Sequence, residues 1–145
     1  MFEACARGHL SVCEWLHERG AAEDVTKATV DGTTPMMLAC VRGHLPVCGW
    51  LVKMGAAGDV SRRDQEGNTP LLQACVNDQL AVCEWLCTVG AAKDVRAANH
   101  EGYTPMLLAC LGGQLAVCEW LFAKASSTAK KLESNFSTTI ALLFG

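Results

Sequence analysis

Nine cysteines and four histidines are the residues of this chain whose chemistry could bind a metal ion or attack a substrate. All the cysteines except Cys87 fall into two series in which the same position recurs every 35 residues. The first series is Cys5, Cys40, Cys75 and Cys110, and the second is Cys13, Cys48, Cys83 and Cys118. Regularly spaced thiols of this kind could in principle hold a metal ion or form disulfides.

The spacing within and between the series argues against both roles. The chain has no Cys-x-x-Cys pair, and the Cys40/His44 spacing does not recur in every copy, as a repeated metal site would require. Equivalent positions on stacked helices lie about 8–10 Å apart, farther than the separation of about 7 Å that a disulfide allows between Cα atoms. We therefore expect buried cysteines that act as small hydrophobic residues, with no metal and no cofactor.

Catalysis by a Cys–His pair is also disfavoured. Such a nucleophile needs a third, orienting group and an oxyanion site, and identical pairs repeated along a chain rarely make one active site. His9 and His44 are replaced by Gln79 and Gln114 in later copies. Histidine and glutamine share the ability to hydrogen-bond across a loop, so we expect a structural role and no enzymatic activity.

Composition narrows the remaining classes of function. Half of the 145 residues are hydrophobic, and the net charge is −3, with Arg62-Arg63 and Lys130-Lys131 as the adjacent basic pairs. This charge pattern is unlike that of proteins that bind nucleic acid or anionic membranes. The first residues do not resemble a secretory signal, and no apolar run reaches the eighteen or so residues that a membrane span needs. An odd number of cysteines favours a reducing, intracellular setting, and we expect the cytoplasm.

A repeat of 35 residues sets the architecture. Thr-Pro occurs at residues 34, 69 and 104, Ala-Cys follows in constant register, and Val-Cys-x-Trp-Leu begins at residues 12, 47, 82 and 117. Thr34 and Pro35 predict a helix start, so a first helix should run to about Arg42 and end at Gly43. A second helix should run from Leu45 or Pro46 to about Lys53. Each is too short to persist alone in water, so stability must come from stacking.

The repeated tryptophans lie at one position of the predicted second helix. They are Trp15, Trp50, Trp85 and Trp120. A large aromatic side chain at a constant position of a stacked unit is expected to fill the core between units.

The string from Gly32 to Cys48 resembles the ankyrin repeats, and the resemblance covers about residues 1–124. It implies an all-α solenoid of stacked helix–turn–helix units with projecting hairpin loops, here a partial first unit followed by units near 32–66, 67–101 and 102–124. Two features depart from the family. The usual His after Thr-Pro-Leu is Met37, Leu72 or Leu107, and the period is 35 residues where the family has about 33. The added residues follow the second helix, so we expect longer hairpin loops.

Residues 125–145 fit the repeat poorly and form either a degenerate fifth unit or a C-terminal tail. Residues 137–143 nevertheless fall in register with residues 32–38 and keep both threonines. At the other end, residues 1–5 align with the interior of a first helix, at residues 36–40. A non-autonomous fragment of a larger ankyrin protein, with further repeats as its neighbours, is therefore an alternative interpretation.

Positions that vary between units are the candidates for function, because repeated positions build the stack. The resemblance implies that those after Ala-Cys line a concave face, and the others lie at the loop tips. The predicted partner-binding residues are Arg7, Val30, Asp31, Thr33, Val41, Arg42, Gln65, Glu66, Asn68, Val76, Asn77, His100, Glu101, Tyr103 and Leu111. We predict a protein-interaction module or scaffold that binds another protein there; a cysteine-based metal or redox protein is the weakest alternative.

Overall fold

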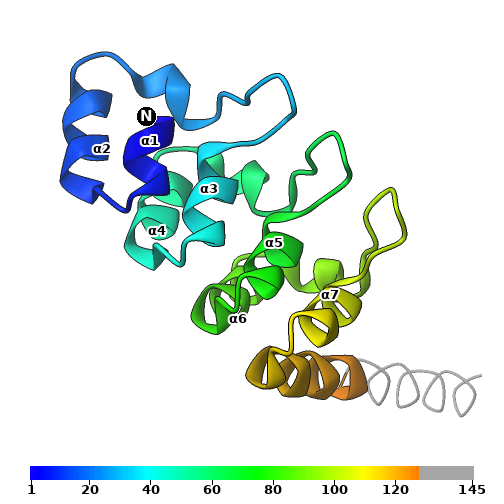
Figure 1. Ribbon diagram of the computed structural model, residues 1–145. Helices are drawn as coiled ribbons and strands as arrows, with labels where there is room; N and C mark the ends of the chain where they lie inside the picture. Colours follow the sequence, from blue (N-terminus) through cyan, green and yellow to red (C-terminus); the bar gives the residue numbers. More distant parts are fainter. Residues whose placement is uncertain (128–145) are drawn as a thin grey trace, which may run out of the picture.

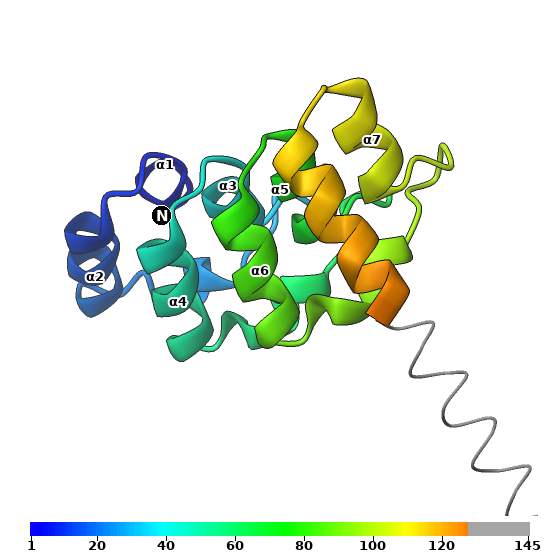
Figure 2. The ribbon, with the colours of Figure 1, turned by 90° about the horizontal axis from the view of Figure 1, so that it is seen from below.

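The computed structural model describes residues 1–127, which form helix pairs stacked side by side along the chain (Figure 1). The first helices of the pairs make one row and the second helices make another, as the view in Figure 2 shows. The row of first helices is α1 (Phe2–Ala6), α3 (Pro35–Val41), α5 (Pro70–Val76) and α7 (Pro105–Leu111). The second row is α2 (Leu10–Glu18), α4 (Leu45–Lys53), α6 (Leu80–Thr88) and a helix that covers residues 115–127. Residues 1–127 contain no β-strand, so the predicted all-α solenoid is confirmed.

Each first helix after α1 begins as the Thr-Pro pattern predicts. The hydroxyl of Thr34 accepts a hydrogen bond from the backbone N–H of Met37 at 3.2 Å, and Pro35 occupies the first turn. The same bond occurs at the two later threonines. Met37, at the position of the family's usual histidine, is buried, so this copy gains apolar packing where a polar side chain is more common.

The segment between the second helix and the hairpin, where the sequence placed the extra length of the repeat, is partly helical. After α4, Gly55 adopts φ +109°, a conformation open to glycine at little cost, and the 3₁₀ helix η2 (Ala56–Ser61) follows. Equivalent 3₁₀ helices occur as η1 (Ala22–Val25) and η3 (Ala91–Arg96). A hairpin then leads to the next unit, and it is closed by the N–H of Asp64 and the carbonyl of Asn68 at 3.1 Å.

Two of the side chains that follow the first helices, His44 and Gln114, link neighbouring units. His44 Nε2 donates to the carbonyl oxygen of Ala6 at 3.1 Å, and Gln114 Nε2 donates to the carbonyl oxygen of Val76. Gly8 permits the first of these contacts, because a Cβ there would lie 2.5 Å from Nδ1 of His44. The predicted bridging role of these side chains is therefore confirmed for His44 and Gln114.

The core runs through the middle of the stack and contains most of the cysteines. Cys5, Cys13, Cys40, Cys48, Cys75 and Cys83 are buried, as predicted. The prediction is wrong for Cys110, which is exposed, while Cys87 and Cys118 are half-buried. Cys110 belongs to the last unit of the described residues, where no further helix pair of that range covers α7.

The tryptophans also differ from one unit to the next. Trp50 is 8% exposed and packs edge-on against His17 of the preceding unit, with ring centroids 5.8 Å apart. Trp15 is 53% exposed, so the prediction of a core residue is wrong there. The reason is positional: this side chain faces the preceding unit, and Trp15 lies in the first. The guanidinium of Arg19 lies 5.3 Å from its ring centre instead.

Residues 128–145, which include most of the predicted fifth unit, lie outside the described residues. Residues 125–127 continue the helix that begins at residue 115.

The two tryptophans at opposite extremes of burial give a matched test of stacking. We expect Trp50→Ala to lower the free energy of unfolding by about 3–5 kcal/mol, because it removes a buried ring from the contact between two units. Trp15→Ala should cost about 1 kcal/mol or less, since its ring is largely solvated. Urea denaturation followed by circular dichroism measures both; equal losses would contradict the assigned orientation of this position.

Candidate partner-binding surface

A row of exposed side chains follows the first helices. Arg7, Arg42 and Asn77 come directly after α1, α3 and α5, and each is exposed. Leu111 ends α7 and is also exposed, whereas Val41 and Val76 are half-buried one position earlier in their units. Because the helices stand side by side (Figure 1), the structure brings these predicted residues onto one face.

The hairpin tips form a second set of predicted residues, and the backbone ties them together. The N–H of Gln65 donates to the carbonyl oxygen of Asp31 at 2.9 Å, and the N–H of His100 donates to that of Glu66 at 2.9 Å. Tips that are far apart in sequence therefore make one continuous edge. The predicted side chains at this edge are exposed, except that Thr33 is partly covered and Asn68 is buried.

Side chains on the hairpins reinforce this edge. Arg63 Nη1 donates to the carbonyl oxygen of Gly67 at 2.7 Å and to that of Ala98, in the next hairpin, at 2.9 Å. Gln65 Nε2 donates to the carbonyl oxygen of Val30 at 2.6 Å. Bonds that span successive units hold the tips in one arrangement, a preorganisation of the kind that lowers the entropic cost of binding in general.

An acidic hollow of about 250 Å³ lies between the first two tips. Its lining residues are Asp31, Thr33, Asp64, Gln65, Glu66 and Gln73. Hydrogen bonds from the hydroxyls of Thr29 and Thr33 lower the pKa of Asp31, so this carboxylate is charged at neutral pH.

Sequence reasoning missed two residues of this hollow. Asp64 and Gln73 occupy positions that hold Thr29 and Leu38 in the preceding unit, so their variability between units was visible. The sequence did not show that the hairpin approaches α5. This approach brings both residues to one hollow.

Asn68 has a structural role in the hairpins. Its Nδ2 donates to Asp64 Oδ2 at 3.0 Å and to Glu66 Oε2 at 3.1 Å, and its Oδ1 accepts from Asn99 Nδ2 at 2.9 Å. Burial and a filled hydrogen-bonding capacity leave little of this side chain for a partner. We therefore omit Asn68 from the surface proposed below.

Replacing Asn68 with alanine tests its structural role in the hairpins. We expect Asn68→Ala to lower the free energy of unfolding by about 1–3 kcal/mol, because the carboxylates of the hairpin lose a buried donor. Tyr103→Ala, at the equivalent and more exposed position of the next unit, is the matched control and should change stability much less. Chemical denaturation measures both, and a neutral Asn68→Ala would contradict the structural role.

The two cysteines of a unit lie in contact as free thiols, and burial lowers their reactivity. Cys40 and Cys48 bring their Sγ atoms to 3.8 Å, and Cys75 and Cys83 to 3.5 Å. Burial raises the pKa of Cys5 to about 12, so its thiol stays protonated at neutral pH. No group of three or more His, Cys, Asp or Glu side chains within residues 1–127 is placed to hold a metal ion.

Alkylation of the reduced, folded protein should follow exposure. We expect iodoacetamide at neutral pH to modify Cys110 first and to spare Cys40, whose pKa is raised by its hydrogen bond to Cys48 and by burial. Peptide mapping by mass spectrometry gives the order of reaction, and modification in urea, where the order should vanish, is the control. Early modification of Cys40 in the folded protein would contradict the packing described.

The fold is a helical solenoid. Its repeated unit is a capped helix–turn–helix followed by a projecting hairpin, and side chains link each unit to the next. The family model described as "Ankyrin repeats (3 copies)" matches residues 1–97 and 59–134. The chain therefore belongs to the ankyrin repeat family, whose members are generally protein-interaction modules and typically not enzymes. A search of the curated proteins found none that matches. Among residues 1–127, no helix is both long and apolar enough to cross a membrane.

Proposed function

We propose that this protein is an interaction module or scaffold that binds another protein through the face of its first helices and its hairpin tips. The observation that supports this most is the joining of the tips into one edge beside the exposed row at the helix ends. Both sets consist largely of positions whose residue type changes from unit to unit, whereas the Ala-Cys and Val-Cys-x-Trp-Leu positions of the stack recur. We propose no catalytic activity and a reducing cellular compartment, in keeping with nine free cysteines.

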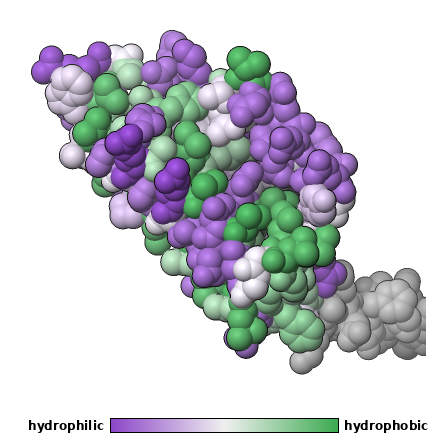
Figure 3. All heavy atoms as spheres, in the orientation of Figure 1, coloured by the Kyte–Doolittle hydropathy of each residue, from purple (hydrophilic) through white to green (hydrophobic). Residues whose placement is uncertain are grey.

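The chemistry of the surface suggests what a partner must supply. The acidic hollow suits hydrogen-bond donors or basic side chains, because Asp31, Asp64 and Glu66 border it. Arg62 is paired with Asp59, and Arg63 donates to backbone carbonyls, so these bonds of the two arginines are not with the carboxylates of the hollow. The space-filling view shows hydrophilic residues gathered over the hairpin side of the array (Figure 3).

Apolar and amphipathic groups complete the surface. Tyr103 is an exposed aromatic side chain at a hairpin, and Arg42 lies exposed at the end of α3. Tyrosine and arginine are enriched among residues that dominate binding energy, so we expect these two to contribute most.

A triple variant tests this surface. We expect Arg42→Ala, Asn77→Ala and Tyr103→Ala together to reduce capture of the partner at least about tenfold, because each removes an exposed side chain at the proposed contact. Partners are captured from a cell extract with the parent protein and identified, and binding is then measured with the purified partner. Circular dichroism should show an unchanged fold.

The matched control replaces three equivalent exposed residues of the second helices, Glu14, Glu84 and Glu119, with alanine. This control should bind as the parent does. If the first triple variant binds unchanged, or if only the control loses binding, the proposed surface is wrong.

A further inference from the structure

The first unit exposes apolar positions that the inner units bury. Val12 is 44% exposed, whereas Val47 at the same position of the next unit is 1% exposed. Trp15 and Trp50 differ in the same way. Trp50 packs on His17 of the unit before it, so these positions face toward the start of the array.

The last described unit exposes the complementary positions. Leu107 is 43% exposed, whereas Leu72 is 2% exposed. Phe122, which holds the position of His17, is 70% exposed, and Leu111 is 71% exposed. Figure 3 shows hydrophobic residues gathered over α7 at this end. These positions face away from the start of the array.

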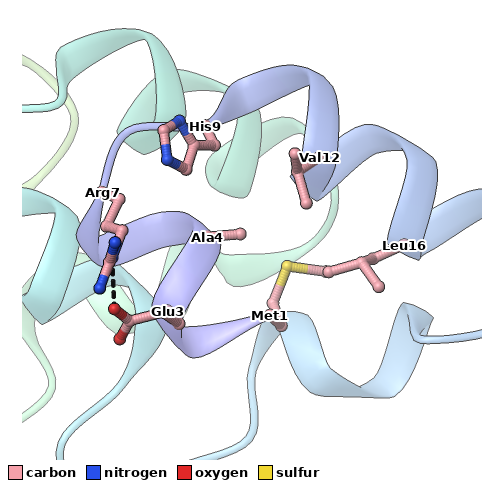
Figure 4. A pocket seen from close by; sticks show the side chains of 7 residues that line it. All are labelled: Met1, Glu3, Ala4, Arg7, His9, Val12 and Leu16. Atoms are coloured by element: carbon pink, nitrogen blue, oxygen red, sulfur yellow. Dashed lines mark hydrogen bonds and ion pairs between the residues drawn. The ribbon is translucent and has the colours of Figure 1, made fainter.

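A hollow of about 360 Å³ opens at the first unit between α1 and α2 (Figure 4). Figure 4 shows the side chains of Met1, Val12 and Leu16 directed into the space between the two helices. Its other lining residues are Glu3, Ala4, Arg7 and His9. Glu3 and Arg7 form an ion pair at its edge, which leaves the apolar side chains as its floor.

The contacts inside the array show how such a pair of end faces fits together. Where two units meet, His44 donates to the carbonyl oxygen of Ala6, and Trp50 meets His17. At the ends of the array, His9 holds the position of His44 and the Leu111 carbonyl holds that of Ala6. Trp15 likewise holds the position of Trp50, and Phe122 that of His17. The two end faces are thus the two halves of an interface that the chain already builds between its own units.

We propose that the first-unit face of one copy, formed by Val12, Trp15 and the hollow, docks on the last-unit face of a second copy, formed by Leu107, Leu111, Leu115 and Phe122. A joint of this kind is head-to-tail and uses a different patch on each copy, so it does not close on itself in a dimer. It continues the stacking of α1 on α3 and of α5 on α7 from one chain into the next.

The joint should be weaker than the contacts within the chain. The internal units are also linked by tip-to-tip backbone bonds, as between Gln65 and Asp31. The proposed joint uses the helix faces and no bonds of this kind between tips. We therefore expect association that is reversible and that increases with protein concentration.

Sedimentation velocity over about a hundredfold range of concentration tests the proposal on the full 145-residue chain. The mean mass should rise with concentration for the parent. One variant carries Leu111→Glu and Phe122→Glu, and another carries Val12→Glu and Trp15→Glu. Each removes one face, so each should be monomeric alone. A mixture of the two retains one intact pair of faces and should form a dimer that grows no further.

Met54→Glu, which places the same charge on an exposed apolar residue of an inner unit, is the control and should associate as the parent does. All the altered positions are exposed, and circular dichroism should show unchanged helix content. A parent that stays monomeric throughout overturns the proposal. Failure of the mixture to form a dimer overturns it as well. So does a dimer of either variant alone, which an interface between two copies of the same face would give.

Discussion

The packing of each helix pair against the next is the interaction on which the rest of the structure depends. α3 has seven residues and α4 has nine, fewer than an isolated helix needs to persist in water. Caps such as Thr34 fix where a helix starts, but they satisfy one donor each and cannot replace the burial of its apolar face. Most of the stabilisation therefore comes from apolar burial in the stack, where Leu51, Leu71 and Leu86 are fully buried.

The same constraint places the proposed binding surface. Stacking sets the spacing of the helices, the helices set the spacing of the hairpins, and only hairpins at that spacing can join tip to tip. The bonds from Arg63 and Gln65 then tie each tip to the neighbouring hairpin. Rigidity at the tips is thus a consequence of order in the stack, and a partner meets a surface whose main conformational cost is already met in folding.

The sequence predicted what recurs and failed where a residue's surroundings do not recur. Helix starts at Thr34, the glycine turns and the fold class followed from local rules that hold in each unit. The predicted burial of Trp15 and Cys110 was wrong. A sequence repeat places the same residue in every unit, but the neighbours of that residue differ at the two ends of the described array. Asn68 shows a related limit. Variation between units marks freedom from the stack, yet a varied side chain can still be committed to its hairpin, and only the bonds to Glu66 and Asn99 reveal this.

The cysteines show how stacking controls the reactivity of a repeated side chain. Cys40 and Cys48 come from the two helices of one unit and bring their sulfur atoms to 3.8 Å, a contact that a small side chain allows and a larger one would push apart. The burial that makes them useful for packing also raises the pKa of Cys40, so the thiolate that would react is suppressed. Within residues 1–127, Cys110 of the last unit is the exposed thiol, and we expect it to react first. A residue in this array is therefore governed first by whether a neighbouring unit covers it, and only then by its own chemistry.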